Sequence, residues 1–88
     1  MVSVSHILNF MACHGYCVSL AFFPEDGNGT GYAAEFTYEK PVMPEKKNSC
    51  GMYQTAVMNA AERLFQQDPE IARRWAEETL KCLYKDKT

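Results

Sequence analysis

An 88-residue chain with 47% hydrophobic and 23% charged residues is expected to fold as one globular domain, residues 1–88. A domain this small buries only about 60–65% of the surface that its unfolded chain exposes, which leaves little room for an enclosed active site. The net charge of −2 argues against a nucleic-acid-binding protein, and no apolar run approaches the length needed to cross a bilayer. The N-terminus has no basic segment of the signal-peptide type, so we expect a cytoplasmic protein with reduced thiols.

The first thirteen residues do not indicate one type of structure. Val2 and Val4 alternate with serines, as in a strand, whereas Ile7 and the apolar residues that follow it cluster as in a short helix. We expect a short strand or loop followed by one or two helical turns that end at Gly15, and the choice between strand and helix stays open.

Residues 16–39 show the clearest pattern in the chain. Two runs of alternating apolar residues, about 16–23 and 31–39, flank a turn that is rich in glycine and acidic residues, which predicts an antiparallel β-hairpin. Successive side chains of a strand point to opposite faces. One face of the hairpin should therefore carry Tyr16, Val18, Leu20, Phe22, Tyr32, Ala34, Phe36 and Tyr38.

The other face of this hairpin is not cleanly polar, because it carries Phe23 beside alanines, Ser19 and two glutamates. A solvated face would not ordinarily hold a phenylalanine. We expect either the N-terminal segment around Ile7 and Phe10 or another chain to cover it.

Two helices should follow the hairpin. Asn48 or Ser49 is a suitable N-cap for a helix that continues to Gln67, with its apolar residues on one face. Asp68-Pro69 then predicts the start of a second helix, in which Trp75 lies on the apolar stripe. The fold expected is α+β: an antiparallel hairpin or three-stranded sheet packed against two C-terminal helices.

Four cysteines, at positions 13, 17, 50 and 82, raise the question of a metal site. Three residues, the first of them His14, separate Cys13 from Cys17, but structural zinc sites usually contain two closely spaced ligand pairs. The preferred interpretation is that the thiols are small apolar groups without a metal, a cofactor or a catalytic role. Binding of a metal by Cys13, His14 and Cys17 stays open.

Carboxylates on the hairpin are the predicted contact residues for a partner. Glu35 and Glu39 should project from one face of the second strand, and Glu25 and Asp26 lie in the turn. Acid–base catalysis would need a pocket that shifts their pKa values, which a hairpin of this size does not suggest. An acidic surface of this kind suits a basic protein surface.

Lys46 to Leu64 carries a basic loop followed by an alanine-rich helix, and in this it resembles the double-stranded-RNA-binding domain. That resemblance implies a third strand and a dense lysine cluster at the helix start. This chain has Asn48, Ser49, Cys50 and Gly51 there instead. A nucleic-acid-binding module is therefore the alternative interpretation, and direct binding of nucleic acid is not expected.

In size and acidic character, the chain resembles the small inhibitor proteins of phages and mobile elements, including anti-CRISPR proteins. The resemblance rests on no motif. It implies a non-enzymatic protein that binds a larger host complex by surface complementarity, without a cofactor, for example an effector with a basic surface. The sequence also leaves a homodimer open.

Overall fold

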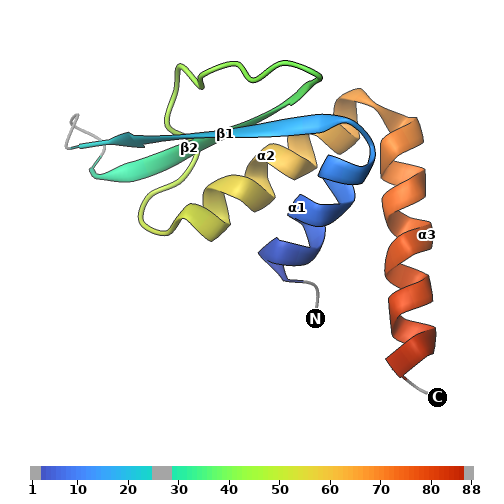
Figure 1. Cartoon of the computed structure of the whole chain (residues 1–88). Helices are drawn as coiled ribbons and strands as arrows, with labels where there is room; N and C mark the ends of the chain where they lie inside the picture. The colour runs from blue at the N-terminus through green and yellow to red at the C-terminus, as the bar shows by residue number, and fades with distance from the viewer. Residues whose placement is uncertain (1–2, 25–28, 87–88) are drawn as a thin grey trace.

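The computed structural model describes residues 3–24 and 29–86, with side chains up to residue 81 (Figure 1). Its elements are α1 (Val4–Cys13), β1 (Tyr16–Phe23), β2 (Gly31–Tyr38), α2 (Tyr53–Gln67) and α3 (Pro69–Asp86). The α+β class is confirmed. In the described part of the chain the sheet has two strands, and the segment between β2 and α2 contains no third one.

Helix α1 occupies most of residues 1–13, for which the sequence did not distinguish a strand from a helix. The expectation of an extended start is wrong at Val4, because the helix already begins there. The Ser3 hydroxyl accepts a hydrogen bond from the backbone N–H of His6 at 3.2 Å and so caps the helix. Ile7, Phe10 and Met11 follow at helical spacing and are buried.

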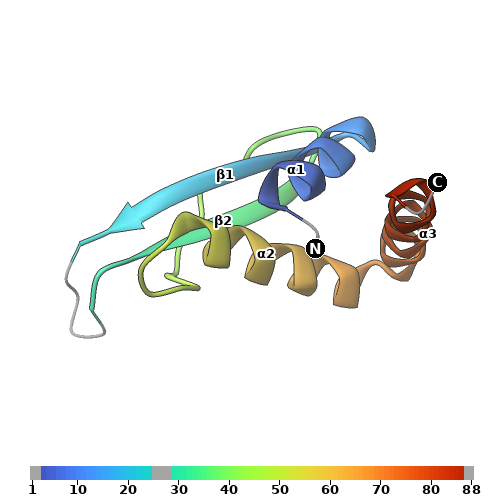
Figure 2. The ribbon, with the colours of Figure 1, turned by 90° about the horizontal axis from the view of Figure 1, so that it is seen from below.

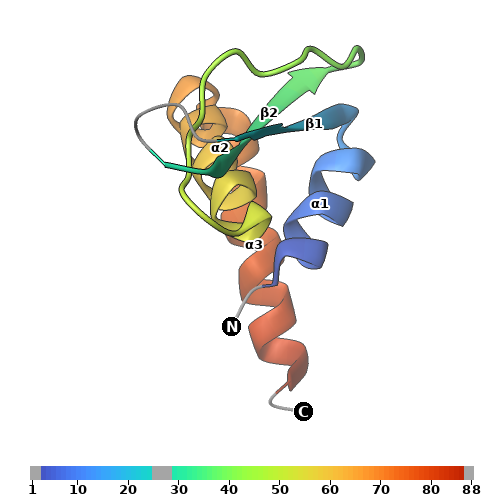
Figure 3. The ribbon, with the colours of Figure 1, turned by 90° about the vertical axis from the view of Figure 1, so that its left-hand side faces the viewer.

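The hairpin has the predicted faces. β1 and β2 pair antiparallel from Tyr16 opposite Tyr38 to Phe23 opposite Gly31. The face that carries Ala34 and Phe36 packs on the helices, with both residues in the same core cluster as the apolar residues of α1 and α2. Figure 3 shows α1 and α2 on this one side of the sheet.

The expected packing of the sheet against two C-terminal helices is seen in part. α2 contacts β2 extensively, whereas α3 packs on α2 and reaches α1 through Trp75. The Trp75 ring lies 4.9 Å from that of Phe10 and 6.2 Å from that of Phe65, measured between ring centroids. The indole thus joins all three helices, although it is only half-buried.

The face of the sheet away from the helices is covered by the segment from residue 39 to residue 52, which passes over β2 (Figure 1). Ala33 on this face is 0% exposed, and Pro44 of the covering segment is buried. The expectation that residues around Ile7 and Phe10 cover this face is wrong, since those residues pack on the opposite one.

The same segment explains why α2 begins later than expected. Met52, rather than Asn48 or Ser49, is the N-cap residue, and Gly51 just before it has a φ of 97°, outside the helical region. Asn48 instead ties the segment to β2: its backbone N–H donates to the Tyr32 carbonyl, and its amide donates to the Ala34 carbonyl at 2.9 Å.

The start of α3 is where the sequence placed it. The Asp68 carboxylate accepts hydrogen bonds from the backbone N–H groups of Glu70 and Ile71, at 3.2 and 3.4 Å. These are the unpaired donors of a first helical turn, which a capping aspartate satisfies.

Candidate functional site

The predicted acidic contact residues are only partly assembled. Glu25 and Asp26 lie outside the described residues. Glu35 is half-buried on β2, beside a shallow depression of about 70 Å³ that Arg63 of α2 also lines. Glu39 is exposed and follows the last residue of β2, so it belongs to a turn and not to the strand.

Glu39 has the most unusual backbone of this set. Its φ of 67° lies in the left-handed region, and no other non-glycine residue in the described part of the chain has a positive φ. An L-amino acid with a Cβ typically loses about 1–2 kcal/mol in this conformation. The conformation persists because hydrogen bonds surround it. The Glu39 N–H donates to the Gly15 carbonyl at 2.9 Å, and the next N–H, of Lys40, donates to the Tyr38 carbonyl at 2.8 Å.

Two side chains complete this turn. The Thr37 hydroxyl donates to the Lys40 carbonyl, and the Cys17 thiol lies 3.6 Å from the Glu39 carbonyl as a weak donor. These bonds therefore fix the Glu39 backbone at the base of the hairpin, next to the end of α1. An exposed glutamate at such a costly backbone position is a candidate contact residue.

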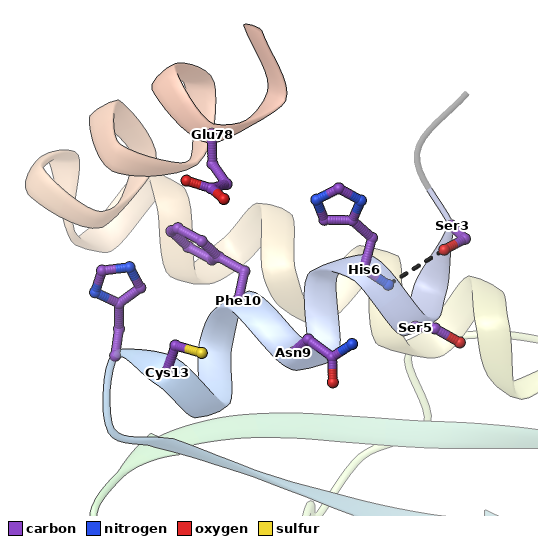
Figure 4. A pocket seen from close by; sticks show the side chains of 8 residues that line it. Ser3, Ser5, His6, Asn9, Phe10, Cys13 and Glu78 are labelled. Atoms are coloured by element: carbon purple, nitrogen blue, oxygen red, sulfur yellow. Dashed lines mark hydrogen bonds between the residues drawn. The ribbon is translucent and has the colours of Figure 1, made fainter. Parts of the chain in front are cut away.

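A groove of about 490 Å³ runs between α1 and α3 (Figure 4). Phe10 and His6 point into it from α1, and Glu78 points into it from α3. Arg74 pairs with Glu70 at 3.2 Å and not with Glu78, which the i,i+4 spacing would equally allow. A neighbouring depression of about 360 Å³ extends the groove along the charged side chains of α3.

The α1 side of this groove carries a thiol and imidazole groups. Cys13 and His14 both line it, and the His14 ring lies 4.5 Å from the Phe10 ring. Cys17 sits instead on the sheet, where its thiol faces the Glu39 carbonyl. Among the described residues, no three His, Cys, Asp or Glu side chains come close enough together to hold a metal ion.

The basic loop that suggested a nucleic-acid site lies between β2 and α2, and one of its lysines packs against the start of β2. The Lys47 ammonium donates to the Gly29 carbonyl, and its aliphatic stem lies over Gly31. Lys47 is half-buried, whereas Lys40 and Lys46 are exposed. Lys47 therefore takes part in the packing of the loop against β2, and Lys40 and Lys46 are the exposed lysines of this segment.

Sequence reasoning missed one polar contact between distant segments. The Tyr16 hydroxyl donates to the Asp68 carboxylate at 3.0 Å and so joins the start of β1 to the start of α3. Burial, and then the hydrogen bond and negative charge of Asp68, raise the pKa of the Tyr16 phenol above its ordinary value of 10.0. No local pattern could have shown this contact, because 52 residues separate its partners.

Comparisons of the chain with protein-family models, with curated proteins and with solved structures found no match. Within the described residues, no helix combines the length and the apolar character that a membrane span requires.

Proposed function

We propose that this protein is a non-enzymatic inhibitor or modulator that acts in the cytoplasm by binding a larger host complex, as anti-CRISPR proteins do. The observation that carries the proposal is Glu39. An exposed glutamate occupies a left-handed position that glycine would adopt without cost, and hydrogen bonds to neighbouring segments hold it there. Because Glu39 destabilises the fold at this position, we assign it a function there, which is contact with the partner.

The contact surface in this proposal consists of Glu35 and Glu39, extended by Glu25 and Asp26 of the hairpin turn. Its partner is a basic protein surface, for which the negative net charge of the chain is suitable. Because Glu35 is half-buried whereas Glu39 is exposed, Glu39 is expected to dominate the interaction.

The experiment begins with capture of the partner from a lysate by tagged protein, with identification by mass spectrometry. Binding of the purified partner is then compared for wild type and the double variant Glu35→Lys/Glu39→Lys at low and high salt. We expect affinity at low salt to fall about tenfold or more, mainly through slower association, with a smaller effect at high salt. The matched control is Glu45→Lys/Glu62→Lys, which makes the same charge change at two exposed positions outside the proposed contact surface.

A second variant separates contact from folding. Glu39→Gly removes the carboxylate and relieves the left-handed strain, so its unfolding free energy should stay equal to that of wild type or rise by up to about 1 kcal/mol. Binding should nevertheless weaken. Unchanged affinity in both Glu39 variants at both salt concentrations would place the contact elsewhere and remove the support for this proposal.

A further inference from the structure

The outer edge of β1 has no partner strand in the described part of the chain. The sheet contains β1 and β2 only, and β2 is closed on its far side by hydrogen bonds from Asn48 and Arg63. Figure 2 shows β1 at the rim of the molecule. All eight residues of β1 are uncharged and none is proline, so it lacks the features that usually protect an edge strand from pairing.

The register shows which backbone groups face this open edge. The Glu39 N–H donates to the Gly15 carbonyl, so odd-numbered residues of β1 hydrogen-bond to β2 in the alternating antiparallel pattern. The N–H and C=O groups of Val18, Leu20 and Phe22 therefore point outward. β2 shows the same alternation, because the outward carbonyls of Tyr32 and Ala34 accept hydrogen bonds from the covering segment.

The side chains of the same three residues are exposed, and their exposure rises along the strand. Val18 is 37% exposed, Leu20 44% and Phe22 54%. The reason is the position of α1, which lies across the Tyr16 end of β1 and leaves the Phe22 end uncovered (Figure 2). The open edge and the uncovered apolar row thus belong to one surface.

We propose that this surface pairs with β1 of a second copy of the chain, in an antiparallel arrangement with a two-fold axis at Leu20. The backbone of Val18 then forms hydrogen bonds with the backbone of Phe22 in the second copy, and Leu20 pairs in the same way with Leu20 of the second copy. Every pair brings outward-facing backbone groups together and sets two apolar side chains side by side.

Three properties of the edge favour a second copy as its occupant. An antiparallel pair of identical strands is self-complementary under two-fold symmetry. An uncharged strand can pair with itself without like charges meeting, although the chain as a whole is acidic. Finally, the two β1 strands run in opposite directions. The Tyr16 end of one strand, which α1 of its own copy covers, therefore lies beside the uncovered Phe22 end of the other. The result is a four-stranded sheet with all helices on one face.

The surface is small. The area that one strand edge and three side chains can bury is smaller than the roughly 800 Å² that each partner buries in a standard interface. We therefore expect a dimer with a dissociation constant in the micromolar range that dissociates on dilution. The inference goes beyond the proposed function and does not depend on it.

The test is sedimentation equilibrium of the full chain in reductant, from about 10 µM to about 1 mM, a range that brackets the expected constant. Wild type should shift from 10.0 kDa toward twice that mass. Leu20→Lys places two ammonium groups opposite each other at the axis and should raise the dissociation constant at least tenfold. Leu80→Lys is the matched control, since Leu80 is 53% exposed on α3, and it should dimerise like wild type. Circular dichroism checks that both variants fold.

Amide hydrogen exchange supplies the second measurement. The amides of Leu20 and Phe22 should gain protection between the lowest and the highest concentration, whereas those of Ser19 and Ala21, already bonded to β2, should not change. A chain that stays monomeric to 1 mM overturns the proposal and leaves the edge to a strand of another protein. A dimer that survives Leu20→Lys, or that leaves the Leu20 amide unprotected, overturns it as well.

Discussion

Asp68 should contribute to stability in two separable ways. One carboxylate oxygen caps α3 through the N–H groups of Glu70 and Ile71, and the other accepts the Tyr16 hydroxyl. An N-cap is typically worth about 1 kcal/mol, and a half-buried hydrogen bond to a charged group about another 1 kcal/mol. Asp68→Ala should therefore lower the unfolding free energy by about 2 kcal/mol, and Tyr16→Phe by about 1 kcal/mol.

A double-mutant cycle in urea, followed by circular dichroism, tests this division. In the Asp68→Ala background, Tyr16→Phe should cost almost nothing, so the coupling energy should be about 1 kcal/mol. Asp68→Asn keeps a capping oxygen and should fall between wild type and Asp68→Ala. If Tyr16→Phe costs the same in both backgrounds, the hydrogen bond does not stabilise the fold and the reasoning is refuted.

The same contact predicts a pH dependence. The pKa of Tyr16 is higher in the folded state than in the unfolded state, where it is about 10. The contribution of the Tyr16 phenol to the unfolding free energy is therefore complete below about pH 10 and is lost as the pH rises through the folded pKa. The difference in unfolding free energy between wild type and Tyr16→Phe should be constant from pH 7 to 9 and shrink above pH 10. A difference that instead grows in alkali would contradict the assigned sign.

Two further substitutions test the packing of the fold. Trp75→Ala should lower the unfolding free energy, measured in urea, by about 2–3 kcal/mol. This is less than the roughly 3–5 kcal/mol typical of a fully buried tryptophan, because Trp75 is half-buried. Leu80→Ala on the same helix is the control and should stay within about 0.5 kcal/mol of wild type, because Leu80 is exposed. Gly31→Ala should cost about 1–3 kcal/mol in thermal melts, because the added Cβ meets the Ser49 carbonyl of the covering segment, while Thr30→Ala at an exposed neighbouring position should change little. A wild-type melting temperature for Gly31→Ala would show that this segment can move away from β2 at no cost.

Local chemistry alone determined several parts of this structure. The two faces of the hairpin follow from strict alternation, since a strand offers its side chains only two directions. The start of α3 follows from Asp68-Pro69, because a capping carboxylate and a fixed proline φ both favour a first helical turn. These features depend on neighbours a few residues away.

Other features depend on contacts between distant residues. Residues 4–13 form a helix because Ile7, Phe10 and Met11 find a core made by β2 and α2, which their short apolar pattern could not reveal. The late start of α2 has the same kind of cause, since Asn48 bonds to β2 and so cannot serve as the cap that its residue type suggests.

The surfaces that we propose for binding depend on tertiary structure in the same way. The acidic residues could be named from the sequence, but the left-handed backbone of Glu39 and the position of Arg63 beside Glu35 arise from the turn and from α2. The alternation of β1 predicted an apolar row. Only the tertiary structure decided that α1 covers one end of that row and leaves the other open, because coverage depends on where a helix lies across a strand and not on the order of residues within either.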